Sequence, residues 1–282
     1  MANATRRQTG AKSSLLAQYR GLKELGSVHG KFANGFNVQF PTRLLYVGNC
    51  DAPLSAFGIT IPSDRMATLL SGLSIGDLVT HKGEKLFIYG RDGVMRLDLA
   101  GLEDIDLKFQ RYTFDPAMLA SSEVFSLLED MKLSDATGLD RNQETHRQLT
   151  KLWQSDKEDF AENYRLVSYL AGRGVGLTPS GDDILLGFTF ALMLFGKFVH
   201  WERAISIGIN KETTTAISMA YLTALLSGYV SEPLLQFSAL MNCNGSGLVR
   251  EKTKAVAAFG HTSGVDVLFG FYMGLKFLLN KA

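Results

Sequence analysis

The chain has 282 residues, with 29 Lys and Arg against 28 Asp and Glu, for a formal net charge of +1. Hydrophobic residues make up 46% of it, which is enough for a sizeable core in one large domain or two ordinary ones. The near-neutral charge excludes a dedicated nucleic-acid binder, which needs a basic footprint. Two cysteines, Cys50 and Cys243, are too few for a disulfide scaffold or a zinc cluster and suit a reducing compartment.

The sequence predicts neither a signal peptide nor a membrane span. The basic residues near the N-terminus are followed by no apolar core of the signal-peptide type. The most apolar run, at 184–195, is ended by Lys197, whereas a bilayer span needs about 20 residues. We therefore expect a cytoplasmic protein that has no membrane partner.

Residues 1–112 carry the patterns of β-strands. Asn34-Gly35 is a hairpin signal, and the alternation at 36–40 is typical of a half-buried strand. Turn-forming residues separate further strand-like runs, which lie at 44–47, 57–61, 78–81, 86–89 and 94–97. Closely spaced hairpins predict an antiparallel β-rich domain of barrel-like or sandwich-like form.

Residues 113–282 are predicted to form a mostly α-helical domain, so the expected fold class is α+β. Apolar residues at helical spacing occupy 123–131, 184–195, 215–228 and 265–279. A capping-box pattern that begins at Ser155 predicts the start of another helix, which should stop at Gly172 or Gly174.

One short segment of the helical half occurs twice. Residues 180–188 (SGDDILLGF) resemble residues 263–271 (SGVDVLFGF), at an offset of 266 − 183 = 83 residues. Two helices are therefore expected to start in the same way. We also expect them to pack as pseudo-symmetric partners through Gly187 and Gly270.

The repeated residues allow two interpretations. Ser-x-x-Asp before an apolar run is a helix N-cap with an acidic first turn, which gives the serines and the second aspartates a structural role only. Asp182 is different, because the other copy has Val265 in its place and a cap does not require it. The alternative is a ligand site at the two helix starts, formed by Ser180, Gly181, Asp183, Ser263, Gly264 and Asp266.

The loop before the first copy is unusually rich in glycine. The chain has 28 glycines, about a tenth of its length against a usual ~7%, and Gly172, Gly174 and Gly176 crowd this one loop. Such a loop at a helix N-terminus presents backbone N–H groups and the positive dipole end to an anion. It lacks the Gly-Lys-Ser/Thr ending of a P-loop. We expect it to bind phosphate or carboxylate, with Thr178 beside it and Arg173 as a bidentate partner, unless Arg173 is simply a surface residue.

Asp182 and His261 are the candidate catalytic residues. Asp182 would repel an anion unless a divalent cation or a substrate amide lies between them, which makes it the candidate ligand of Mg²⁺ and the only cofactor prediction. His261 can act as an acid or base if the two helix starts face each other, with a packed histidine as the alternative. Thr214 and Thr215 open another helix and either bind an anion or cap that helix.

Three motifs follow one another along the chain: 174–183 (GVGLTPSGDD), 214–218 (TTAIS) and 260–266 (GHTSGVD). This set resembles the AllH-like family, long catalogued as a domain of unknown function, whose named members are assigned as a subunit of oxamate carbamoyltransferase. The resemblance is dense from about Tyr164 to the C-terminus and looser in the β-rich half.

The resemblance implies a cytoplasmic role in allantoin (purine) breakdown. The complex would move a carbamoyl group between oxalurate and phosphate, giving oxamate and carbamoyl phosphate, and two other subunits are implied, one of them resembling acyl-CoA ligases. Backbone amides at 174–181 would hold phosphate or carboxylate and Arg173 would pair with it. His261 would polarise the carbamoyl carbonyl or move a proton, and Asp182 would orient the carbamoyl NH₂ or a Mg²⁺.

The chain lacks the Ser-Thr-Arg-Thr phosphate loop of the aspartate and ornithine carbamoyltransferases. Either another kind of site carries the chemistry, or this subunit does not hold the whole site. Three hypotheses follow: an enzyme subunit with an anionic site, a non-catalytic assembly or regulatory subunit, and a stand-alone carboxylase or transferase for another small acid.

Overall fold

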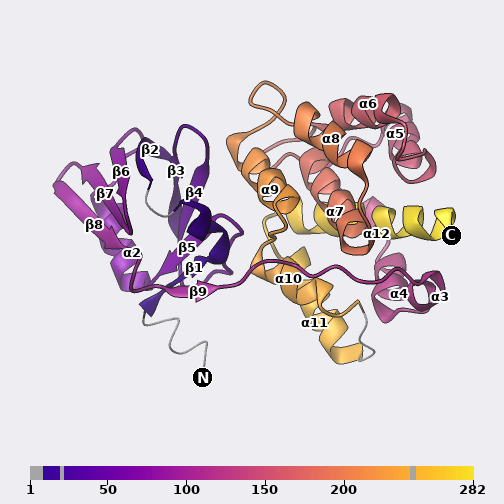
Figure 1. Ribbon diagram of the computed structural model, residues 1–282, viewed down its shortest axis with the longest axis horizontal. Helices are drawn as coiled ribbons and strands as arrows, with labels where there is room; N and C mark the ends of the chain where they lie inside the picture. Colours follow the sequence, from indigo (N-terminus) through magenta and orange to yellow (C-terminus); the bar gives the residue numbers. More distant parts are fainter. Residues whose placement is uncertain (1–8, 20–21, 242–245) are drawn as a thin grey trace. The chain divides into compact units, whose positions relative to one another are not determined.

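The computed structural model describes residues 9–19, 22–241 and 246–282, so Cys243 lies outside the described residues. The chain divides into two compact units, one formed by residues 1–108 with 229–232 and the other by residues 109–228 with 233–282 (Figure 1). Each unit is described by itself below.

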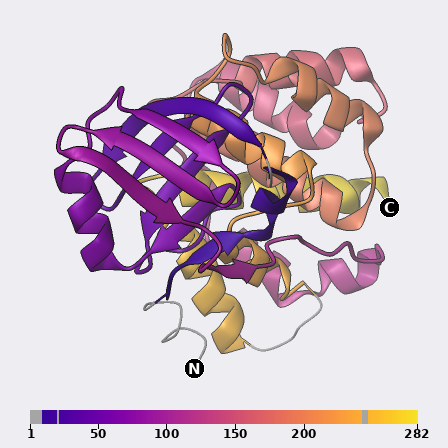
Figure 2. The same ribbon diagram turned by 60° about the vertical axis from the view of Figure 1, so that its left-hand side comes forward.

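The first unit is built on one curled, nine-stranded sheet with the strand order β8-β7-β6-β2-β3-β4-β5-β1-β9 (Figure 2). Its elements are β1 (Ala11–Ser13), η1 (Ser14–Tyr19), β2 (Lys23–Phe32), β3 (Gly35–Gln39), β4 (Leu44–Asn49), β5 (Gly58–Ile61), α2 (Ser63–Ser71), β6 (Leu78–Lys82), β7 (Lys85–Gly90), β8 (Gly93–Asp98) and β9 (Glu103–Ile105). Most neighbouring strands pair antiparallel, while β4–β5 and β1–β9 run parallel.

The predicted strands are confirmed, and one turn is shifted. The hairpin at Asn34-Gly35 joins β2 to β3, but Phe32 pairs with Gly35, so the turn residues are Ala33 and Asn34. A Cβ on Gly35 would lie 2.5 Å from the carbonyl oxygen of Val47. Gly35 therefore serves the close approach of β4 and not the turn.

The second unit consists of helices. They are α3 (Pro116–Ala120), α4 (Glu123–Asp130), η2 (Leu133–Asp135), α5 (Gln143–Gln154), α6 (Phe160–Leu170), α7 (Ser180–Phe195), α8 (Val199–Gly208), α9 (Ala216–Leu226), α10 (Glu232–Ser238), α11 (Ser246–Ala257) and α12 (Ser263–Lys281). The α+β fold class is thereby confirmed. Aromatic residues fill the core around α7, where the Phe188 ring packs edge-on against Trp201 at 4.9 Å.

The capping box predicted at Ser155 is wrong. Ser155 is the C-cap of α5, and α6 begins five residues later with Asp159 as its N-cap, accepting from the Glu162 amide at 3.0 Å. The segment between them places Lys157 in the core, where its ammonium lies 5.2 Å from the Trp201 ring. The start of α6 is thus set by Asp159 as its N-cap and not by Ser155.

The two repeated segments form the most closely packed helix pair of this unit. A Cβ on Gly187 would lie 1.9 Å from the carbonyl oxygen of Val267, and one on Gly270 would lie 2.0 Å from that of Ile184. The prediction that α7 and α12 pack through these two glycines is confirmed. The backbones touch directly because neither glycine carries a side chain.

Candidate anion site at two helix N-termini

Helices α7 and α12 run parallel and begin side by side. Ile184 lies against Gly270 and Phe188 against Gly274, while Gly187 lies between Val267 and Phe271, so the contacting residues advance together along both helices. Each helix start also packs on the end of the preceding helix, because a Cβ on Gly181 or Gly264 would lie 2.0 Å from the carbonyl oxygen of Leu170 or Val256. The sequence repeat is therefore a structural repeat about an approximate twofold axis.

The first turns of the two helices exchange polar contacts. The carboxyl group of Asp183 is hydrogen-bonded by the hydroxyl group of Ser263, and that of Asp266 by the hydroxyl group of Ser180. The Gly138 amide also donates to Asp266 Oδ1 at 3.1 Å. Thr178 also donates to the carboxyl group of Asp183 and Thr262 to that of Asp266, so each aspartate is held by the serine of the other copy together with a nearby threonine.

This exchange overturns the capping interpretation of the two serines. The N-cap residues are Pro179 for α7 and Thr262 for α12, and neither helix has a side-chain cap hydrogen bond. Ser180 and Ser263 are instead the first helical residues. Their hydroxyl groups face across the helix pair because the two N-termini lie side by side.

Both aspartates are buried with one oxygen unsatisfied. Asp183 is 5% exposed and Asp266 0% exposed, and the Oδ2 atom of each has no hydrogen-bond partner within the described residues. Burial raises the pKa of Asp183 well above its usual range and the neighbouring carboxyl group of Asp266 raises it further, while the Ser263 hydroxyl group opposes the shift. Burial likewise raises the pKa of Asp266. A buried acceptor oxygen destabilises the folded protein unless a hydrogen-bond donor reaches it.

The glycine-rich loop before α7 is fixed at its ends and open in its middle. The Arg173 carbonyl accepts from the Gly181 amide at 2.8 Å, and the Leu177 carbonyl accepts from the Thr215 hydroxyl at 2.6 Å. Between these points, the backbone amides of residues 174–178 donate to no acceptor in the part of the chain that the structure describes. Gly174 and Gly176 have φ values of +118° and +95°, which turn successive N–H groups in the manner of an anion-binding nest.

The second helix start contacts this loop. The hydroxyl groups of Thr178 and Ser263 lie 2.7 Å apart. His261 is exposed in the turn just before α12, next to Gly260 with its φ of +67°. The structure therefore brings the predicted loop and the predicted histidine turn to the same end of the helix pair.

Asp182 has a different environment from the other two aspartates. Its Oδ1 atom accepts from the Gly172 amide at 2.8 Å, and its Oδ2 atom accepts from the Thr214 hydroxyl group. Burial raises the pKa of Asp182, and these donors oppose the shift. Both oxygens are thus already used to tie the loop to the start of α9, where Thr215 is the N-cap and accepts from the Ser218 amide at 3.1 Å.

Arg173 lies half-buried at the beginning of the loop. Its guanidinium group stacks 4.0 Å from the Tyr169 ring centroid, and Nε donates to the Tyr169 carbonyl at 2.9 Å. These contacts fix the side chain near the loop. No group of three or more His, Cys, Asp or Glu residues within the described ranges has a geometry that could hold a metal ion.

A cavity of about 610 Å³ lies in the same unit. It is lined by residues of the 134–142 turn, by α5 and by α12, including Trp153 and Lys276. Thr137 and Leu139 line the cavity, whereas Gly138 between them contacts the site, since a Cβ there would lie 2.3 Å from Ser180 Oγ and 3.5 Å from Asp266 Oδ2. Sequence reasoning missed Gly138, which belongs to no motif and is brought in from a distant turn.

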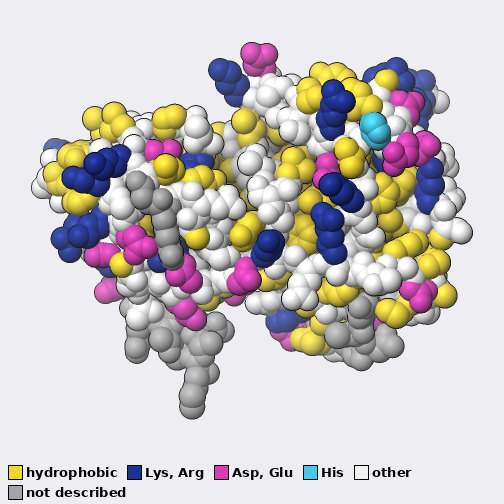
Figure 3. All heavy atoms as spheres, viewed as in Figure 1, with side chains coloured by type: hydrophobic (Ala, Val, Ile, Leu, Met, Phe, Trp, Pro, Cys, Tyr) yellow, Lys and Arg dark blue, Asp and Glu magenta, His cyan; other side chains and the backbone are white. Residues whose placement is uncertain are grey.

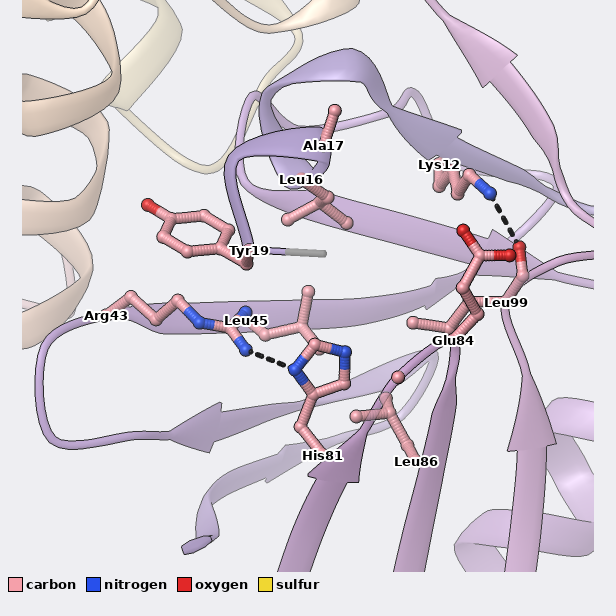
Figure 4. Close-up of a pocket in the computed structure, with 11 residues that line it drawn as sticks. Lys12, Leu16, Ala17, Tyr19, Arg43, Leu45, His81, Glu84, Leu86 and Leu99 are labelled. Atoms are coloured by element: carbon pink, nitrogen blue, oxygen red, sulfur yellow. Dashed lines mark hydrogen bonds between the residues drawn. The ribbon is translucent and has the colours of Figure 1, made fainter. Parts of the chain in front are cut away.

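The first unit contains a smaller pocket with charged side chains, shown in Figure 4. Arg43 donates to Glu24 at 2.7 Å and lies 3.0 Å from His81 Nδ1. Lys12 donates to the Leu99 carbonyl at 2.7 Å (Figure 4). Burial, followed by the Arg43 charge, lowers the pKa of His81. The pocket has a volume of only about 30 Å³ and its cations are already paired, so it is the weaker candidate for ligand binding.

Acidic and basic side chains are mixed on the face of the molecule shown in Figure 3, which carries no large patch of one charge sign. This agrees with the formal net charge of +1. Among the described helices, none combines the length and the apolar character needed to cross a membrane.

No solved structure matches the chain. A family model described as "Oxamate carbamoyltransferase subunit AllH" matches residues 170–275, a segment that begins at the end of α6 and contains both repeated helix starts. The first unit's sheet lies outside it. This segment of the chain is therefore similar to the AllH family, whose name denotes a subunit of oxamate carbamoyltransferase.

Proposed function

We propose that this chain is the subunit of a cytoplasmic oxamate carbamoyltransferase that binds the anionic substrate at the paired N-termini of α7 and α12. The reaction moves a carbamoyl group between oxalurate and phosphate in allantoin breakdown. A phosphate oxygen attacks the ureido carbon of oxalurate, the bond from that carbon to the oxamate nitrogen breaks, and the proton of hydrogen phosphate ends on that nitrogen. The products are carbamoyl phosphate and oxamate.

The observation that carries the proposal is the set of unbonded amides at residues 174–178. They lie at the N-terminus of α7, beside the N-terminus of α12, so two positive dipole ends act on the same space. Oxalurate, oxamate, phosphate and carbamoyl phosphate are all anions. Arg173 contributes a guanidinium group from the start of the loop, and Thr178 and Ser263 contribute hydroxyl groups.

His261 is the residue that moves the proton in this proposal. It is exposed in the turn before α12, where its imidazole is free to approach a ligand held by the loop. Asp182 acts as a positioning residue because both of its oxygens hold protein donors. A Mg²⁺ ion on Asp182 would have to displace these donors.

The loop tip favours assembly with other subunits. Val175 is 88% exposed and Leu177 is 55% exposed, which places two apolar side chains beside the unbonded amides. We propose that the two further subunits, one of them resembling acyl-CoA ligases, cover this tip. A non-catalytic assembly subunit would use the same tip without binding an anion.

Calorimetry of the full chain with inorganic phosphate separates these alternatives. Saturable binding that is lost in Gly176→Ala supports the anion site. Gly76→Ala is a matched control, because Gly76 and Gly176 have φ values of +94° and +95° and open space around them, so both variants suffer similar local strain. Absence of phosphate binding by the unaltered chain, with tight binding to partner subunits, would favour the assembly role.

A further inference from the structure

Asp183 and Asp266 are the two groups at this site whose chemistry the anion-binding loop leaves unexplained. A carboxylate repels an anion, yet both lie in the first turns of the helices that present the amides. Each has an Oδ2 atom without a partner among the described residues, at exposures of 5% and 0%. A buried unpartnered oxygen of this kind needs an N–H or O–H donor.

We infer that Asp183 and Asp266 recognise the NH₂ group of the carbamoyl moiety, each accepting one N–H at its Oδ2 atom. This inference rests on the proposed function. The ligand it describes has an anionic end for the loop amides and a donor end for the carboxylates, and carbamoyl phosphate has both within one small molecule.

The approximate twofold symmetry explains why two carboxylates serve one group. An NH₂ group has two N–H bonds in one plane, and the α7–α12 pair supplies two equivalent acceptors, each oriented by the serine of the other helix. Asp182 cannot take this role without losing the Gly172 and Thr214 donors. The unmatched aspartate of the repeat is structural, whereas in the matched pair each carboxyl group keeps one oxygen without a partner among the described residues.

The loop and the carboxyl pair are linked through Ser180. Gly174 packs on Ser180, because a Cβ on Gly174 would lie 2.7 Å from the Ser180 amide nitrogen and 3.3 Å from Ser180 Oγ. Ser180 in turn hydrogen-bonds Asp266. The amide end and the carboxylate end are therefore separated by a single residue.

Gly138 lies between the carboxyl pair and the 610 Å³ cavity. Its backbone lies on Ser180 and Asp266, and the neighbouring residues Thr137 and Leu139 line the cavity. A ligand that entered from the cavity would have to displace the Gly138 amide, which donates to Asp266 Oδ1 at 3.1 Å. A Cβ on Gly138 would lie 2.3 Å from the Ser180 hydroxyl oxygen, so a side chain there would also displace that hydroxyl group.

The test compares carbamoyl phosphate with acetyl phosphate, which replaces the NH₂ group by a methyl group of similar size. Calorimetry of the unaltered full chain should show carbamoyl phosphate binding at least about 10-fold tighter, since a site built to bond N–H groups rejects the analogue without them. In Asp183→Asn and Asp266→Asn the ratio of the two affinities should fall towards one. Asp159→Asn, at the N-cap of α6 and outside the site, should leave that ratio unchanged.

The possible failures are distinguishable. Equal affinities for the two ligands in the unaltered chain would overturn this inference while leaving the anion site intact, and that result needs no variant to fold. An unchanged ratio in folded Asp266→Asn and Asp183→Asn would overturn it as well. Absence of binding by phosphate and by both acyl phosphates would instead overturn the proposed function.

Discussion

Replacing Gly187 by alanine tests the helix pair on which the site is built. In the native packing a Cβ at this position would lie 1.9 Å from the Val267 carbonyl oxygen and 2.7 Å from the Phe271 amide nitrogen. Both obstacles are backbone atoms of α12, so no side-chain rotation relieves the clash. The two helices must move apart, which loosens the alignment of Ser180 with Asp266.

The expected magnitude follows from two opposing effects. Overpacking a well-packed core costs about 1–3 kcal/mol and occasionally more, and a clash with backbone belongs to the upper end of that range. Alanine recovers about 1 kcal/mol through its better helix propensity. We therefore expect Gly187→Ala to lower the free energy of unfolding by about 2 kcal/mol, and Gly270→Ala to do the same because its obstacle is the Ile184 carbonyl at 2.0 Å.

Urea unfolding of the full chain measures this change, and α11 offers a matched control. Gly247 is also a helical glycine, but a Cβ there would meet nothing within 4 Å. Gly247→Ala should therefore leave the free energy of unfolding unchanged or raise it by up to about 1 kcal/mol. A neutral or stabilising effect of Gly187→Ala would refute the direct backbone contact between α7 and α12.

Three further predictions concern buried charges. Burial raises the pKa of Asp183 and Asp266, so above about pH 4 the unfolded chain binds fewer protons than the folded chain, and stability falls as pH rises through the raised values. Asp266→Asn should flatten that fall when the free energy of unfolding in urea is measured against pH. An identical pH dependence in the variant would contradict the prediction. Burial lowers the pKa of Lys157 to about 7, so the free energy of unfolding should rise from pH 7 towards 10 by on the order of 4 kcal/mol. Lys157→Met should abolish this rise. If the variant keeps the rise, Lys157 is not its source. Arg43→Met should cost about 3–5 kcal/mol by leaving the Glu24 carboxylate, 2.7 Å away, without its cation, whereas a loss below 1 kcal/mol would mean that this pair is solvated.

Local sequence patterns predicted a helix or strand correctly where the residues that determine it lie within that element. Apolar periodicity gave α4, α7, α9 and α12, and strand alternation gave β3 to β8, because each element buries a face that its own residues specify. The repeat predicted the α7–α12 pair for the same reason, since equal helix starts and equal glycines imply equal packing. Ser155 misled the prediction because burial of Lys157 in the core outweighs a local cap.

The site itself was predictable only in part. The sequence identified the loop and the three aspartates, but hydrogen bonding between Ser180 and Asp266 joins residues from different copies and follows no local spacing. The sequence set Asp182 apart from Asp183, because the other copy has Val265 in its place, but only the donors on both of its oxygens show that Asp182 holds the loop. Gly138 comes from a separate turn, so only the folded chain reveals it.

The most direct test of the central claim is a titration of the ¹⁵N-labelled chain with inorganic phosphate, followed by amide chemical shifts. If the paired helix starts bind the anion, saturable shifts should be largest at Gly174, Val175 and Gly176, with smaller ones at His261 in the second helix start. Shifts confined to other places, such as the pocket beside Arg43, or no saturable shift at residues 174–178, would contradict the account.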